Sequence, residues 1–162
     1  MALDLVTELV GLLDALERES VDYAVCGGLA VGMLARPRAT KDIDILIQRD
    51  DLARAKALAI ACGFDIPARK MIFKQGTPQE QEMHRLSKID PEDGALMPVD
   101  FLLVVKLFET VWNSRLSVEY LGRKIKVVSI EGLVTMKTIS GRPQDLRDIE
   151  LLKNPDAESD NT

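Results

Sequence analysis

One stretch, residues 23–47, constrains the fold more than any other part of the chain, and it reads YAVCGGLAVGMLARPRATKDIDILI. It opens on a short apolar run, 23–26, which predicts a buried strand that stops at a pair of glycines. A segment of helical composition, 29–35, follows. The stretch closes on residues 42–47, where polar and apolar residues alternate before the run turns wholly apolar, and this pattern predicts a second strand. We therefore expect a strand, a glycine turn, a short helix and another strand in immediate succession.

Two carboxylates lie on the second predicted strand. Side chains alternate between the two faces of a strand, so Asp42 and Asp44 project to the same face, ~6.6 Å apart at ~3.3 Å per residue. Like charges at this distance repel each other unless a cation lies between them, and a divalent metal ion is the simplest candidate. The alternative is a solvated strand face near the end of the sheet. We favour metal binding, because the flanking apolar residues predict burial and an unpaired buried carboxylate is costly.

The glycine pair, Gly27-Gly28, offers a place for an anion. A strand that turns directly into a helix through two glycines brings bare backbone close to a ligand. The first N–H groups of the helix have no partner within it, and the helix dipole adds partial positive charge at that end. Such an end is a phosphate seat, although a plain tight turn would use the same glycines. A phosphate seat that faces metal-binding carboxylates suits a nucleoside triphosphate.

These features resemble the pattern of the nucleotidyltransferase superfamily, which includes DNA polymerase beta, the tRNA CCA-adding enzymes and antibiotic nucleotidyltransferases. The matching residues are C-G-G at 26–28 and R-A-T-K-D-I-D at 38–44, and the second of these is similar to a motif of small bacterial members, including toxin-like ones. The family also has a third carboxylate on a later strand, and Asp100 within V-D-F-L-L at 99–103 fits it. The resemblance runs over about 21–152, and the combination is far more specific than either motif alone.

The resemblance implies a fold, a reaction and a set of site residues. The fold would be α+β (mixed α/β), with a mixed sheet and packed helices as in the polymerase-beta-like catalytic core. Asp42, Asp44 and Asp100 would be catalytic and would bind two Mg²⁺ ions. The enzyme would move a nucleoside monophosphate from a nucleoside triphosphate to a hydroxyl by a two-metal mechanism. Asp100 would also act as the base for that hydroxyl, or as a ligand beside it. The nucleotide-binding residues would be Gly27, Gly28, Arg38, Thr40 and Lys137.

Several of these residues have a plain structural alternative. Asp100 could pair with a neighbouring lysine or arginine, because an unpaired carboxylate in an apolar strand is expensive. Arg38 and Thr40 could be ordinary loop residues, although we favour Arg38 as a phosphate contact. Lys137 and the segment 142–148 resemble the late helical lysine and Arg-x-x-Asp segment of the family, but helix-surface ion pairs of little energetic value are equally consistent.

Composition limits the binding partners and the cellular location that we expect for this protein. The 162-residue chain has a formal net charge of −5, which argues against a broad basic surface for nucleic acid, although Arg36, Arg38 and Lys41 form a local basic cluster. Cys26 and Cys62 are predicted to be reduced residues in apolar surroundings. The acidic N-terminus does not fit a signal peptide, and no apolar run is long enough for a membrane span. We therefore expect a cytoplasmic protein that does not enter the membrane.

Turn signals and periodicity predict one domain, 1–153, followed by a disordered polar tail, 154–162. The predicted helices, besides the one at 29–35, cover 3–18, the stretch from a cap at 50–51 through 61, and 106–112, 131–139 and 144–153. The further predicted strands cover 64–66, 71–73, 83–89, 97–105, 118–120 and 124–128.

Two functional classes stay open at this point. The first is an active nucleotidyltransferase, whose acceptor could be a small molecule, a protein hydroxyl or a tRNA end. The second is a catalytically inactive nucleotide-binding or partner-binding relative, such as a homodimer or one half of a toxin–antitoxin pair. The complete set of three aspartates favours the first, because a retired site usually loses a carboxylate. The lack of an obvious acceptor-binding domain keeps the second open.

Overall fold

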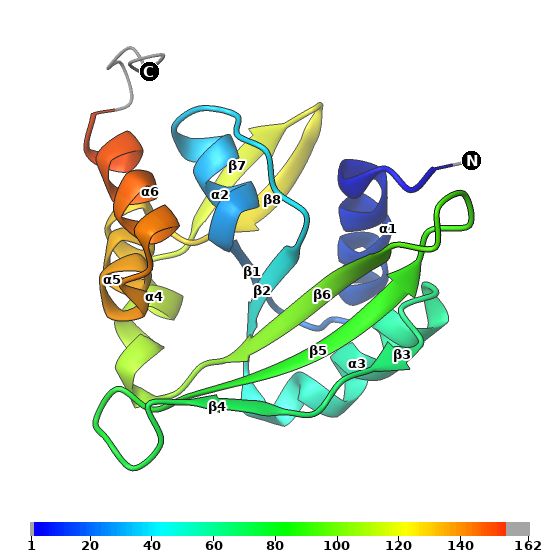
Figure 1. Ribbon diagram of the computed structural model, residues 1–162, viewed down its shortest axis with the longest axis horizontal. Helices are drawn as coiled ribbons and strands as arrows, with labels where there is room; N and C mark the ends of the chain where they lie inside the picture. Colours follow the sequence, from blue (N-terminus) through cyan, green and yellow to red (C-terminus); the bar gives the residue numbers. More distant parts are fainter. Residues whose placement is uncertain (1, 155–162) are drawn as a thin grey trace.

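A mixed β-sheet of eight strands runs through residues 2–154, the part of the chain that the computed structural model describes (Figure 1). The strand order is β3-β5-β6-β2-β1-β8-β7, and β4 pairs with β5 at the same edge as β3. The strands are β1 (Ala24–Cys26), β2 (Ile43–Ile47), β3 (Ile66–Pro67), β4 (Met71–Phe73), β5 (Gln81–Ile89), β6 (Leu96–Leu103), β7 (Leu116–Tyr120) and β8 (Arg123–Val127).

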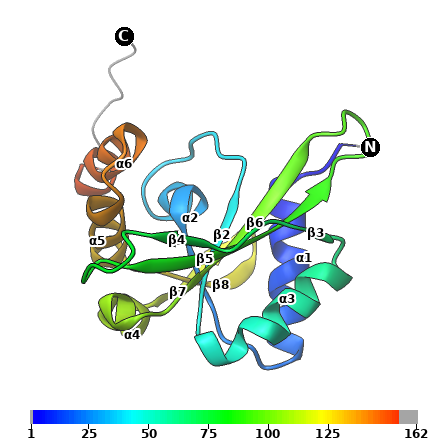
Figure 2. The same cartoon turned by 60° about the horizontal axis from the view of Figure 1, so that its bottom comes forward.

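Six α-helices accompany the sheet within residues 2–154: α1 (Leu5–Arg18), α2 (Gly27–Leu34), α3 (Leu52–Ala61), α4 (Glu109–Asn113), α5 (Ile130–Ser140) and α6 (Pro143–Lys153). Short 3₁₀ turns, 49–51 and 106–108, precede α3 and α4. Helices α5 and α6 pack together at one end of the molecule and α1 and α3 at the other, with α2 between them (Figures 1 and 2). The α+β class with a mixed sheet is confirmed.

Local sequence signals explain where the helices begin. The Asp4 carboxylate caps α1 by accepting a hydrogen bond from the Thr7 N–H at 2.9 Å. Ser129 caps α5 by accepting from the Gly132 N–H, and Pro143 is the first residue of α6, where its missing N–H costs nothing. Four leucines on the apolar face of α1 are fully buried, as their helical spacing predicts: Leu9, Leu12, Leu13 and Leu16.

The central strands of the sheet are buried and almost entirely apolar, apart from a few polar residues. Strand β2 lies between β1, which is antiparallel to it, and β6, which is parallel to it. The side chains of Ile43, Ile45, Leu46 and Ile47 are completely buried, and Asp44 is the one polar residue among them. Parallel strands buried on both faces are expected to be almost wholly apolar, so a carboxylate at this point needs a reason.

A few boundaries differ from the predictions. Helix α2 begins at Gly27, so both glycines of the pair lie in its first turn. Strand β5 begins at Gln81, two residues before the predicted start at 83, because Gln81 pairs with Phe73 of β4. Strand β3 covers Ile66–Pro67 where 64–66 was predicted, and Pro67 is tolerated there because β3 is an edge strand. Asp51 precedes α3 as predicted, but its side chain makes no capping hydrogen bond.

Other expectations concern the setting of the fold. Both cysteines are free thiols; Cys26 is buried and Cys62 only partly buried. None of the helices within residues 2–154 is long and apolar enough to cross a bilayer. The predicted polar tail lies outside the described residues, except for Asn154, which follows the last residue of α6.

Candidate active site

Four neighbouring strands bring polar side chains to one level of the sheet. The Cα register pairs Cys26 of β1 with Asp44 of β2, Asp44 with Asp100 of β6, and Asp100 with Arg85 of β5. Residues paired in this way project to the same face with Cβ atoms ~5 Å apart. Asp42 comes two residues before Asp44 and belongs to the same face. The strand that carries Asp100 therefore lies directly beside the strand that carries Asp44.

The Asp100 carboxylate has a partner that the sequence interpretation did not name. Arg85 donates from Nε to Oδ1 at 2.7 Å and from Nη2 to Oδ2 at 2.9 Å, and Asp100 is only 3% exposed. The same Nη2 atom lies 3.9 Å from Oδ2 of Asp42. The alternative considered for Asp100, a salt bridge, is therefore the state that this structure shows. Arg85 neutralises carboxylates that were predicted to hold metal.

Asp44 is in the opposite situation, because no hydrogen bond or ion pair within residues 2–154 reaches its carboxylate. Burial raises the pKa of Asp44, the negative charges of Asp100 and Asp42 raise it further, and the positive charges of Lys137 and Arg142 only partly oppose them, so that the pKa is about 7. A carboxylate in this position favours the binding of a further cation.

The fit of this cluster to a divalent metal ion can be judged from its donors. Among residues 2–154, no three carboxylate, histidine or cysteine side chains stand together as a ready-made metal site. The oxygen donors of Asp42, Asp44 and Asp100 are nevertheless the hard ligands that Mg²⁺ prefers, and the uncompensated charge of Asp44 is what such an ion would balance. The chemistry of the donors fits, and the assignment of these three residues as metal ligands stays a prediction.

The first turn of α2 lies directly against this cluster. Gly27 has φ +65°, in the left-handed region, and a Cβ atom at this position would collide with the Asp44 carboxylate. At Gly28, a Cβ atom would lie 2.6 Å from Nη2 of Arg38 and 2.9 Å from Oγ1 of Thr40. The turn carries no acidic residue and no side-chain cap, so no capping side chain satisfies its N–H groups. Gly27 therefore adjoins the carboxylates, and Gly28 adjoins Arg38 and Thr40.

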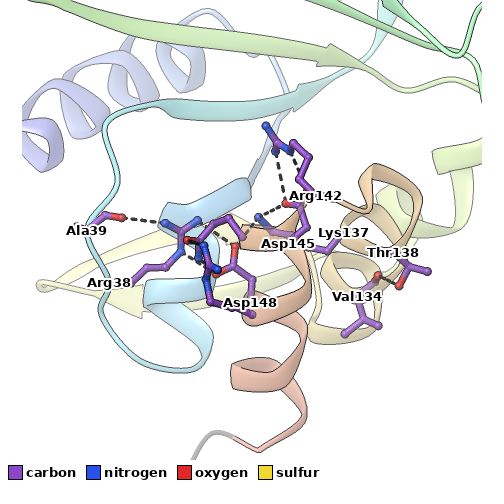
Figure 3. Close-up of polar contacts among 10 residues, drawn as sticks. Arg38, Ala39, Val134, Lys137, Thr138, Arg142, Asp145 and Asp148 are labelled. Carbon is purple, nitrogen blue, oxygen red and sulfur yellow. Dashed lines mark hydrogen bonds and ion pairs between the residues drawn. The ribbon is translucent and has the colours of Figure 1, made fainter. Parts of the chain in front are cut away.

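A second cluster of charges is centred on Asp148 of α6 (Figure 3). This fully buried carboxylate accepts hydrogen bonds from Arg38 Nη2 at 3.0 Å and from Gln144 Nε2 at 2.9 Å. Lys137 of α5 places its Nζ 2.8 Å from Oδ2 of Asp148. Two residues predicted to bind nucleotide, Arg38 and Lys137, are thus joined through one carboxylate.

Asp145 extends this second cluster. It accepts hydrogen bonds from the Arg142 backbone N–H at 3.1 Å and side-chain Nε at 2.8 Å, and Lys137 Nζ lies 3.3 Å away. Burial raises the pKa of Asp145, but hydrogen bonds from Arg142 and Ser140 and the charges of Lys137 and Arg142 outweigh it and hold this pKa at about 2. Because Asp145 and Asp148 are buried, the interpretation of segment 142–148 as weak surface ion pairs is wrong.

A cavity of about 260 Å³ lies on the Arg38 side of α2. Its walls come from the first turn of α1, from α2, from the loop 37–40 and from Tyr120, and they do not include the three aspartates. Thr40 lines this cavity. Asp42 and Asp44, a few residues later, do not line it, and Asp44 lies opposite Asp100 of β6.

The fold of the chain, a mixed sheet with aligned carboxylates on adjacent strands and a helix that begins beside them, is similar to the fold of solved nucleotidyltransferases. No protein-family model and no curated protein matches the sequence. Among solved structures, the chain is similar to the lincosamide antibiotic adenylyltransferase LnuA in its lincomycin-bound crystal structure, with a TM-score of 0.62 and 20% identity over 96% of this chain and 99% of that one. It is also similar to the antibiotic-resistance factor ANT(2″)-Ia in solution, with a TM-score of 0.62 and 11% identity over 91% and 81% of the two chains. The resemblance first inferred from the sequence is thereby confirmed as a likeness of fold.

The close approach of Gly27 to Asp44 can be tested by adding a single methyl group. We expect Gly27→Ala to destabilise the protein by more than the roughly 1–2 kcal/mol of a left-handed alanine, because the methyl group also displaces the carboxylate. Gly94→Ala is the matched control, since Gly94 has φ +74° and nothing within 4 Å of an added Cβ. Denaturant unfolding of the two variants measures the difference, and equal losses would contradict the contact.

The raised pKa of Asp44 predicts a pH-dependent gain in stability for Asp44→Asn. The folded-state pKa of about 7 lies above the ordinary 3.8, so the folded wild type loses stability as the pH rises from about 4 to about 7. Asparagine removes this loss. Solvent screens part of the effect, and we expect the gain in the metal-free unfolding free energy at pH 8 to exceed that at pH 5 by about 1–3 kcal/mol. Asp65→Asn, at an exposed position, serves as the control. If the gain in unfolding free energy did not depend on pH, the ionisation of Asp44 would not be the source of the instability.

Proposed function

We propose that the protein is a magnesium-dependent nucleotidyltransferase that moves a nucleoside monophosphate from a nucleoside triphosphate to a hydroxyl acceptor. The observation that carries this proposal is the register pairing of Asp44 with Asp100 beside the uncapped first turn of α2, within a fold shared with adenylyltransferases. The cytoplasm, where nucleoside triphosphates are available, is the setting that we propose for it.

The reaction assigns a separate task to each group. The N–H groups at the start of α2 bind the triphosphate. Arg38, whose guanidinium lies against Gly28, and Lys137, whose charge acts on Asp44, contact the phosphates. Asp42, Asp44 and Asp100 would hold two Mg²⁺ ions, which when bound neutralise the triphosphate and stabilise the attacking and leaving oxygens. Asp100 accepts the proton of the acceptor hydroxyl. The hydroxyl oxygen bonds to the α-phosphorus while the bond from that phosphorus to the bridging oxygen breaks, and pyrophosphate leaves.

We propose a small molecule as the acceptor. One similar structure is a lincosamide adenylyltransferase, and another, ANT(2″)-Ia, is a complex with adenylyl-2″-tobramycin, so both names concern small hydroxyl-bearing antibiotics. The net charge of −5 also argues against a long polyanionic acceptor such as tRNA. The alternative acceptor to be tested beside a small molecule is a hydroxyl group of a protein.

A second candidate function is a binding protein without turnover, with a partner protein such as an antitoxin or a second copy of the chain. The observation that favours it is the internal pairing of the site: Arg85 satisfies Asp100, and Asp148 satisfies Arg38 and Lys137. A site that has been retired from catalysis would keep such pairs permanently.

Label transfer separates these two functions. Each α-³²P-labelled nucleoside triphosphate would be incubated with Mg²⁺, the protein and one acceptor at a time: a lincosamide, an aminoglycoside, tRNA or the proteins of a cell extract. We expect label on a small molecule, a loss of at least 100-fold for Asp44→Asn and unchanged transfer for Asp65→Asn. Label on tRNA or protein would correct the acceptor. The absence of transfer to every acceptor, with nucleotide still bound, would favour the binding protein.

A further inference from the structure

Arg85 occupies the space between two of the proposed metal-binding carboxylates. Its guanidinium holds both oxygens of Asp100, at 2.7 and 2.9 Å, and its Nη2 atom lies 3.9 Å from Asp42. We propose that Arg85 is the resident counter-cation of this site and makes the binding of a divalent cation conditional on a polyphosphate ligand. This role deepens the proposed function and rests on it.

The two partners of this ion pair differ in their freedom to leave it. The Asp100 side chain is 4% exposed and sits on a central strand, so its carboxylate always needs a cation beside it. The Arg85 side chain is 33% exposed and can turn toward solvent while its backbone stays in β5. An exchange of cations at Asp100 therefore requires only Arg85 to move.

The local charges explain why a metal ion alone would bind weakly. A divalent cation that takes Asp100 leaves the Arg85 guanidinium without its anion. No other carboxylate is in ion-pair contact with Arg85 within residues 2–154, apart from Asp42, which the metal ion would also take. A polyphosphate resolves this, because its charge gives the Arg85 guanidinium a new partner. Its oxygens are also the co-ligands that Mg²⁺ prefers. Binding of metal and of polyphosphate is thus coupled through Arg85.

Another arginine near the cluster, Arg142, provides a matched control. Arg142 acts on Asp44 and Asp42 through its charge, but its hydrogen bonds go to Asp145 in the second cluster. Arg142→Gln therefore removes one positive charge from the neighbourhood without removing an ion pair from Asp100. Arg85→Gln removes the same charge and the ion pair together.

Equilibrium dialysis against Mn²⁺ tests this role of Arg85. We expect the wild type to bind Mn²⁺ alone weakly and to gain at least about tenfold in affinity when inorganic triphosphate is added. Arg85→Gln should bind Mn²⁺ alone at least about tenfold more tightly than the wild type, and Arg142→Gln should change this affinity less than about threefold. If Arg85→Gln fails to fold, Arg85→Lys takes its place, with an expected gain of about threefold because the two-point contact is lost.

Thermal melts supply an independent measurement. In EDTA, Arg85→Gln should melt below the wild type, because Asp100 loses its partner, and Mn²⁺ alone should restore its Tm while leaving that of the wild type unchanged. Equal gains in Mn²⁺ affinity for Arg85→Gln and Arg142→Gln would overturn the inference in favour of general electrostatics. No gain for Arg85→Gln, with the wild type still binding Mn²⁺ and triphosphate together, would overturn it and leave the proposed function standing. If the wild type bound no Mn²⁺ even with triphosphate, both would fall.

Discussion

The parallel pairing of β2 with β6 places two carboxylates, Asp44 and Asp100, side by side on the central strands of the sheet, and the rest of the site depends on how their charge is balanced. Backbone hydrogen bonds set this register, so neither strand can slip to relieve the repulsion without turning its apolar side chains out of the core. Arg85 balances the charge of Asp100, whereas Asp44 has no such partner in the part of the chain that the structure describes, and its pKa is raised to about 7. A fold that tolerates an unpaired, partly buried carboxylate on a central strand gives up stability, and such sites are often functional.

In the second cluster, too, a buried carboxylate is paired with basic side chains. Buried Asp148 holds Arg38 and Lys137, and it ties α6 both to α5 and to the loop that precedes β2. These basic residues, which are suited to phosphate, are therefore already bound to a carboxylate (Figure 3). Arg85 is bound to Asp100 in the same way. A polyphosphate at the start of α2 would compete for these cations, so its binding would redistribute ion pairs in both clusters. Preformed pairs of this kind keep the cations oriented while no ligand is bound.

The sequence predicted the order of the elements and the strands that carry Asp44 and Asp100, because apolar periodicity and glycine and proline signals are local; Asp42 lies one residue before β2. The role of Arg85 was missed, although a signal for it exists in the turn between β5 and β6. The Asp90 N–H donates to the Ala95 carbonyl at 2.8 Å, and counting outward from that pair along the antiparallel strands places Arg85 opposite Asp100. The pairing of Arg38 with Asp148 had no such signal, since 110 residues separate them and only the packing of α6 brings them together.

The most direct test of this account is a crystal structure of the protein with Mn²⁺ and a nucleoside triphosphate analogue whose α–β bridge cannot be cleaved. Anomalous scattering locates manganese without reference to the rest of the density. The account predicts anomalous peaks ~2.1 Å from carboxylate oxygens of Asp44 and Asp100, the triphosphate against the first turn of α2, and Arg85 turned away from Asp100. Manganese bound only to phosphate, with the two hydrogen bonds from Arg85 to Asp100 intact, would contradict it.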